Sequence, residues 1–233
     1  MQAEDRPIHF STELIHPPLQ QGISTLQKLY FELSQSRTGG YDSTDFTTPG
    51  QGRFYSHRGA KTQSVALFLP DRIVVIEEWT DMPLSDFVER VQCVAGQTMR
   101  LLGVPFFAAQ TATVRSTFAL THFDDAREFL LDRACGQTGK IAPHFERPIA
   151  VGGLRFVLPE TPEHRGVLNV AIESFKFSRN EVLVEVKGVY GHPRIGPDDF
   201  DALAKNIQEV RDFISVNAFA YLNQYDRPEE GLV

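Results

Sequence analysis

The chain has 233 residues, of which 42% are hydrophobic and 11% aromatic, a composition typical of a soluble globular protein. Thirty acidic side chains against 23 basic ones give a formal net charge of −7, which disfavours nucleic-acid binding driven by phosphate contacts. No run approaches the roughly 18 apolar residues of a membrane-spanning helix, and the two cysteines have no metal-ligand spacing. We therefore expect a cytoplasmic protein with reduced thiols that binds neither a membrane nor nucleic acid.

The first part of the chain predicts a strand, a helix, three strands and a second helix. Apolar alternation predicts the opening strand at 7–15. Pro17 and Pro18 then allow a helix start, and helical spacing from Leu19 predicts a helix up to about residue 35. Residues 37–51 are rich in Gly, Asp and Ser, which indicates a long loop. The remaining strands are expected at 52–58, 62–69 and 72–79. A helix from Ser85, a candidate N-cap, to residue 102 ends before Gly103.

The second part repeats this order of elements with loops of other lengths. A strand at 108–121 precedes a short helix that ends before Gly136, and a second irregular loop follows at 136–147. Three strands are expected at 148–158, 166–178 and 181–190. A long amphipathic helix at 198–223 closes the chain, with a sustained apolar stripe from Phe200 to Tyr221.

Local matches between the two parts indicate an internal repeat. His16 and His122 end corresponding strands 106 positions apart, and Gly52-Arg53-Phe54 is similar to Leu154-Arg155-Phe156. We therefore predict an α+β protein of two related β-α-β-β-β-α halves, residues 1–104 and 105–233, either tandem ferredoxin-like or helix-grip-like. We expect antiparallel sheets, each covered by a long helix.

The opening strand leading to His16-Pro17-Pro18-Leu19, the paired runs of strands and the helix from Phe200 to Leu222 resemble a sporadically distributed family of uncharacterised bacterial proteins. That family implies a bacterial origin and carries over no catalytic residue. The layout is also similar to the tandem ferredoxin-like repeats of CRISPR repeat-processing endoribonucleases, which use a histidine for acid/base chemistry. This chain departs from them in its acidic balance and in lacking a Gly-rich basic C-terminal segment, so RNA cleavage is the runner-up function.

Six residues are candidates for contact with a ligand or partner. His16 and His122 hold matched positions and would form an acid/base pair or metal ligands if both faced one cleft. The alternative is that each histidine ends a strand and caps the next helix, and no HxH or HExxH spacing supports a metal.

The other four candidates lie in two short segments. His57 and Arg58 end a predicted strand and suit phosphate coordination, although a solvated strand end explains them equally. His192 and Arg194 precede a helix N-terminus, where backbone N–H groups favour anions. Asp198 and Asp199 already place negative charge there, so a rigid turn is the alternative.

The chain has no P-loop, GxGxxG, CxxC or GxSxG motif. We therefore favour a non-enzymatic binding or interaction module that needs no cofactor or metal. Loops 37–51 and 136–147 are candidate surfaces for a protein partner, and a homodimer is expected because twofold symmetry is the commonest oligomeric arrangement. The alternatives are a histidine-dependent endoribonuclease and a small-molecule pocket between a sheet and the long helix.

Overall fold

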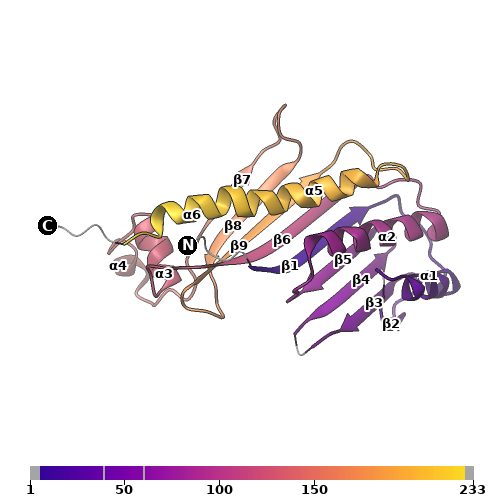
Figure 1. The fold of residues 1–233 in the computed structure, drawn as a ribbon, viewed down its shortest axis with the longest axis horizontal. Coiled ribbons are helices and arrows are strands. Elements are labelled where there is room, and N and C mark those ends of the chain that lie inside the picture. Colours follow the sequence, from indigo (N-terminus) through magenta and orange to yellow (C-terminus); the bar gives the residue numbers. More distant parts are fainter. Residues whose placement is uncertain (1–5, 39, 60, 229–233) are drawn as a thin grey trace.

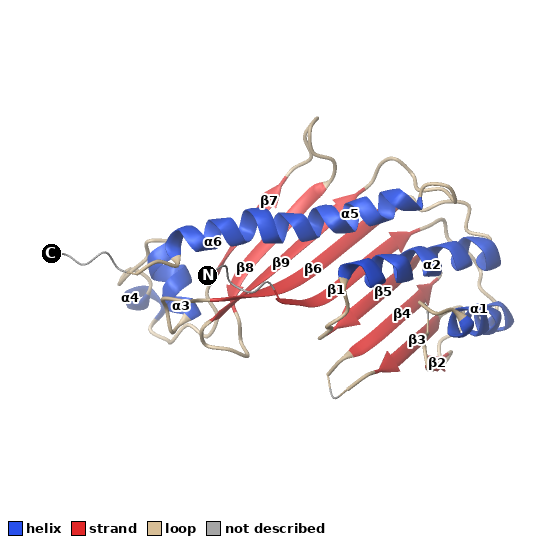
Figure 2. Ribbon diagram, viewed as in Figure 1, coloured by secondary structure: helices blue, strands red, loops and turns tan. Residues whose placement is uncertain are grey.

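The computed structural model describes residues 6–38, 40–59 and 61–228, and it has one antiparallel sheet with helices packed against it (Figures 1 and 2). The strands run in the order β2-β3-β4-β5-β1-β6-β9-β8-β7. Their bounds are β1 Arg6–Ile15, β2 Ser43–Asp45, β3 Gly52–His57, β4 Gln63–Leu69, β5 Arg72–Glu78, β6 Ala109–Ala119, β7 Gly153–Leu158, β8 Val167–Ser174 and β9 Glu181–Tyr190. The helices are α1 Ile23–Gln35, α2 Leu84–Leu102, α3 Ala126–Glu128, η1 Phe129–Ala134, α4 Ala142–Phe145, α5 Phe200–Asp212, η2 Phe213–Ala218 and α6 Phe219–Tyr225.

The α+β class is confirmed, but the expectation of separate sheets is wrong. The two strands expected to open the two halves, β1 and β6, pair along their length from Ile15–Ala109 to Arg6–Thr117. Because β1 also pairs with β5, no sheet edge is left between the two parts of the chain. The related halves and the division at residue 104 stay predictions, and their ends at 1–5 and 229–233 lie outside the described residues.

Alternation along each strand separates a core face from an open face. In β1, Phe10 and Leu14 are fully buried beneath the helices, whereas His9, Ser11 and Glu13 point to the opposite side, which we call the open face. The Phe10 ring stacks on Phe87 of α2 with centroids 5.4 Å apart. Figure 2 shows α1, α2 and α5 over the same side of the sheet.

The long terminal helix agrees with its prediction at 198–223, and one buried amide fastens it to the sheet. Helices α5, η2 and α6 follow one another without a break from Phe200 to Tyr225. Gln110 of β6 donates to the Leu203 carbonyl at 3.3 Å and accepts from the Asn206 amide at 2.8 Å. A buried side chain whose polar atoms are bonded in this way fixes the register between helix and sheet.

The first two helices differ from their predictions at the N-terminal ends. Helix α2 begins at Leu84 after Pro83, so Ser85 is not its N-cap, whereas it ends as expected at Gly103 with φ +71°. Helix α1 begins only at Ile23, because the Leu19 amide donates to Pro70 at 2.8 Å and Gln21 to Leu69 at 3.0 Å. Among the described helices, none is both long and apolar enough to cross a bilayer.

Candidate functional site

A cavity of about 440 Å³ opens on the open face, where the ends of β5, β1, β6 and β9 meet the turn between β8 and β9. Three aromatic rings line it, from Trp79, Phe175 and Phe177. We call it the ring cavity. Its volume lies in the range of small-molecule sites, about 300–1,000 Å³.

The three rings contact one another across elements far apart in the chain. The Phe177 centroid lies 5.5 Å from Trp79 and 5.4 Å from Phe175, both in edge-to-face geometry. The ammonium group of Lys61 lies over Trp79 at 5.3 Å and over Phe177 at 5.5 Å, and Lys176 lies over Phe177 at 4.7 Å. The rim of the cavity thus combines aromatic faces with positive charge.

Trp79 also has an unusual backbone. Its φ is +50°, a left-handed conformation that a bulky residue rarely adopts and that costs on the order of 1–3 kcal/mol. This conformation directly follows the last residue of β5, Glu78. Strained backbone conformations of this kind are found most often at functional sites.

A row of charged side chains forms the floor of the ring cavity. The pairing of the strands places His9 opposite Glu78 on one side and Arg115 on the other, and Arg115 opposite Glu185. His9 Nδ1 lies 2.8 Å from Glu78 Oε1, and Arg115 Nε donates to Glu185 at 2.5 Å. This close contact with His9 is the main reason that the pKa of Glu78 is lowered, with Arg115 adding to it.

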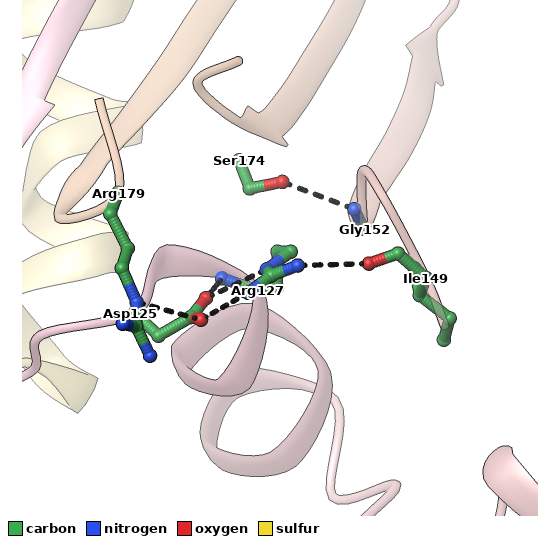
Figure 3. A network of polar contacts seen from close by, with 6 residues as sticks. All are labelled: Asp125, Arg127, Ile149, Gly152, Ser174 and Arg179. Carbon is green, nitrogen blue, oxygen red and sulfur yellow. Dashed lines mark hydrogen bonds and ion pairs between the residues drawn. The ribbon is translucent and has the colours of Figure 1, made fainter. Parts of the chain in front are cut away.

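The turn that carries two of the rings is held by Asp125 (Figure 3). This buried carboxylate accepts hydrogen bonds from the Arg127 side chain and from the Arg127 backbone amide at 2.9 Å, and Arg179 lies 3.3 Å away. The Arg127 side chain is the main cause of the lowered pKa of Asp125. Because Arg179 lies in the β8–β9 turn, the network ties that turn to α3.

The same network orders the segment before β7. Arg127 donates to the Ile149 carbonyl at 3.2 Å, and the Gly152 amide donates to Ser174 Oγ at 3.1 Å (Figure 3). Strand β7 therefore begins at Gly153 rather than at residue 148. Two walls of the ring cavity, Val151 and the 174–177 segment, depend on these bonds.

The structure does not bring His16 and His122 together. The strands that they follow are antiparallel, so the histidines lie at opposite ends of the β1–β6 pair, roughly 30 Å apart for strands of this length. The His16 ring is buried and its Nδ1–H donates to the Pro17 carbonyl at 2.8 Å. His122 is exposed, and its backbone amide donates to Asp226 at 2.9 Å.

The other four candidates also lie outside the ring cavity. His57 and Arg58 are exposed at the end of β3, with the His57 ring 5.4 Å from Tyr55. His192 lines a separate cavity of about 650 Å³ with Asp198 and Asp199, and Arg194 lies over the Phe106 ring at 4.5 Å. That cavity is rich in carboxylates, which disfavours the anion expected at this turn. Ligand or partner contacts of these residues, and of loops 37–51 and 136–147, stay predictions.

Sequence reasoning missed the residues of the ring cavity. The alternation of His9 and Ser11 with Phe10 and Thr12 does place them on one face, and that is the signal available in the sequence. The cross-strand partners of His9, however, are Glu78 and Arg115, which lie 69 and 106 positions later in the chain. No local pattern encodes their pairing. Within the described residues, no three metal-ligating side chains form a group suited to an ion.

Comparison with known proteins adds no relative: no protein-family model matches the chain, and neither does any curated protein.

Proposed function

We propose that this protein is a binding module and that the ring cavity takes a small molecule with a flat aromatic ring and a negatively charged group. The observation that carries the proposal is the cluster of Trp79, Phe175 and Phe177 around a cavity of about 440 Å³. Aromatic rings offer their faces and edges to a flat ligand. A few charged groups at the rim then orient it.

The aromatic cluster has two features that do not favour folding, and these support a role in binding. Phe177 leaves 58% of its surface exposed at the rim, where an apolar side chain gains little from burial. Trp79 maintains a left-handed backbone beside it. The backbone of Trp79 lowers stability and the exposed ring of Phe177 adds little to it, so neither feature is explained by folding alone.

The cations at the rings favour an anionic substituent near them, while the carboxylates of Glu78, Glu173 and Glu185 also line the cavity. The ammonium groups of Lys61 and Lys176 lie at the rings, and Arg115 lies on the floor. Glu78 and Glu185 are paired with His9 and Arg115 respectively, which reduces their repulsion of an anion. The two lysines give the rim of the cavity a positive charge, whereas the chain as a whole has a formal net charge of −7.

Trp79 is the only tryptophan in the chain and makes the test direct. Titration with 8-anilinonaphthalene-1-sulfonate, which is flat, aromatic and anionic, is expected to quench Trp79 emission by energy transfer to the bound probe. Phe177→Ala should raise the Kd about 10-fold, roughly 1.4 kcal/mol, because it removes ring contacts.

The matched control is Phe31→Ala, which removes an equally exposed phenylalanine, at 62%, from α1. It should leave the Kd unchanged. Equal Kd values for the two variants, or the absence of energy transfer in the unaltered protein, would refute the ring cavity as a binding site.

We also propose that the chain arose from two related halves. The order of strands is symmetric about the β1–β6 pair, with β5 and β9 beside it and β4 and β8 next to those. The stretch Gly52-Arg53-Phe54 lies in β3 and its counterpart Leu154-Arg155-Phe156 in β7, at equivalent places in this order. A homodimer stays a prediction, for which the molar mass in solution is the measurement.

A further inference from the structure

Three side chains on the open face form a continuous line that starts at the floor of the ring cavity. Ser11 Oγ lies 2.9 Å from His9 Nε2, and His9 Nδ1 lies 2.8 Å from Glu78 Oε1. His9 and Ser11 are two residues apart on β1 and so share a face, while Glu78 is the cross-strand partner of His9 on β5. A hydroxyl, an imidazole and a carboxylate in this order are the parts of a nucleophile, a base and an orienting group.

The carboxylate favours one nitrogen of His9 as the carrier of the proton. The contact between Nδ1 and Glu78 is close, but its direction does not meet the geometry of a hydrogen bond. An ionised carboxylate repels an unprotonated nitrogen at this distance, so electrostatics favours the proton on Nδ1 in a neutral imidazole. The lowered pKa of Glu78 keeps that carboxylate ionised at neutral pH. His9 Nε2 is then a free acceptor for the Ser11 hydroxyl, which is the tautomer that a general base requires.

His9 and Ser11 differ in burial, and the difference matches the roles of a base and a nucleophile. The His9 side chain is 8% exposed and is covered by its neighbours, so its ring is held in place. Ser11 is only partly buried and is reachable from solvent. A fixed base beside an accessible hydroxyl is the arrangement that nucleophilic catalysis uses.

Two side chains of β6 can donate to a developing oxyanion: Thr113, and Arg115 through the N–H groups that Glu185 does not hold. Both edges of β1 are paired, so its backbone N–H groups are engaged within the sheet. Thr113 lies directly opposite Ser11 and Arg115 directly opposite His9 on the same face. Cross-strand partners have Cβ atoms about 4.5–5.5 Å apart, within reach of a hydroxyl and a guanidinium group.

We propose that Ser11, His9 and Glu78 form a hydrolytic site for carboxylic esters whose aromatic part sits in the ring cavity. This inference rests on the proposed function for the position of the aromatic part. Ser11 Oγ bonds to the acyl carbon while His9 Nε2 takes the hydroxyl proton. His9 returns that proton to the leaving oxygen as the ester C–O bond breaks, which leaves an acyl group on Ser11. Water then gives a proton to His9 and its oxygen to the acyl carbon, and Ser11 recovers a proton as the acid leaves.

The first test is covalent labelling of the serine. A fluorophosphonate probe, which reacts with activated serines, is incubated with the unaltered protein, and the modified residue is mapped by peptide mass spectrometry. Modification at Ser11 is expected and should fall at least 10-fold in Glu78→Gln. Modification at other serines alone, or none, overturns the inference.

The second test measures turnover of 2-naphthyl acetate. Ser11→Ala should lower kcat/KM at least 100-fold, whereas Ser24→Ala, an exposed serine on α1, should leave it unchanged. Phe177→Ala should raise KM with kcat retained, because it changes only the surface that binds the naphthyl ring of the substrate. Equal turnover by the Ser11→Ala and Ser24→Ala variants would overturn the proposal.

The two proposals fail separately. Energy transfer from Trp79 without modification of Ser11 refutes hydrolysis and leaves the binding site in place. Modification of Ser11 without energy transfer, and with KM unaffected by Phe177→Ala, refutes the ring cavity as the seat of the ester.

Discussion

Glu77 of β5 and Arg90 of α2 form an ion pair in the interior, with side-chain exposures of 1% and 6%. Ser64 donates to the second carboxylate oxygen at 2.7 Å, and Arg90 Nε donates to the Thr38 carbonyl at 2.8 Å. The guanidinium carbon also lies 5.7 Å from the centre of the Tyr41 ring. One buried pair therefore joins the sheet, α2 and the segment after α1.

Removal of one partner of this pair is expected to cost more than removal of both. Arg90→Leu leaves the Glu77 carboxylate buried without its cation and should lower the free energy of unfolding by about 3–5 kcal/mol. The double variant Glu77→Leu with Arg90→Leu should recover part of that loss. Urea unfolding of the two single variants and the double variant provides the measurement, and strictly additive losses would contradict the expectation.

The Arg90→Leu variant should also become less destabilised in acid. Burial is the main cause that raises the pKa of Glu77, and Arg90 opposes it, so loss of Arg90 raises this pKa further. A carboxyl whose pKa is higher in the folded state loses stability as pH rises through that pKa. The stability gap between Arg90→Leu and the unaltered protein should therefore shrink from pH 8 to pH 5. A gap independent of pH would show that Glu77 does not titrate in the variant.

Asp125→Asn should loosen the turn that carries Phe175 and Phe177. It weakens a helix cap and charge-assisted bonds to Arg127, for an expected loss of about 1–3 kcal/mol. Because the pKa of Asp125 is lowered in the folded state, its contribution is present above the unfolded pKa of about 3.9 and is lost as pH falls below it. Thermal unfolding between pH 7 and pH 3 should show a steeper decline for the unaltered protein than for the variant. Asp124→Asn, at the exposed neighbouring position, is the control and should follow the unaltered protein.

Gly188→Ala should separate α5 from the sheet. A Cβ at this position of β9 would lie 2.7 Å from both the Tyr190 ring and Val210 of α5. The expected loss is about 1–3 kcal/mol, as for other overpacked cores. Gly191→Ala, where a Cβ would meet nothing within 4 Å, should change stability by less than about 0.5 kcal/mol. Calorimetry of both variants tests the difference, and equal melting temperatures would contradict it.

The sequence predicted elements well where one pattern dominated. Clean alternation located the strand at 181–190, and the apolar stripe located the terminal helix. The same alternation puts Glu77 and Glu78 of β5 on opposite faces, where their partners are Arg90 and His9 respectively. These features depend on local periodicity, which a single sequence contains.

Features that depend on distant partners were not predicted. The expected strand from residue 148 is shortened because Ile149 and Gly152 bond to Arg127 and Ser174 instead. The ring cavity combines residues that follow β5 with residues that follow β8, and only the pairing through β1, β6 and β9 brings these ends together. Local propensity carries no information about such pairings.

The central place of β1 has a consequence during biosynthesis. A ribosome releases this strand first among the nine, yet its two neighbours, β5 and β6, emerge much later. Until β6 arrives, one edge of β1 offers unpaired hydrogen-bonding groups to any strand in reach. The nascent first part of the chain is therefore the state most exposed to wrong pairing, and synthesis of the second part ends that exposure.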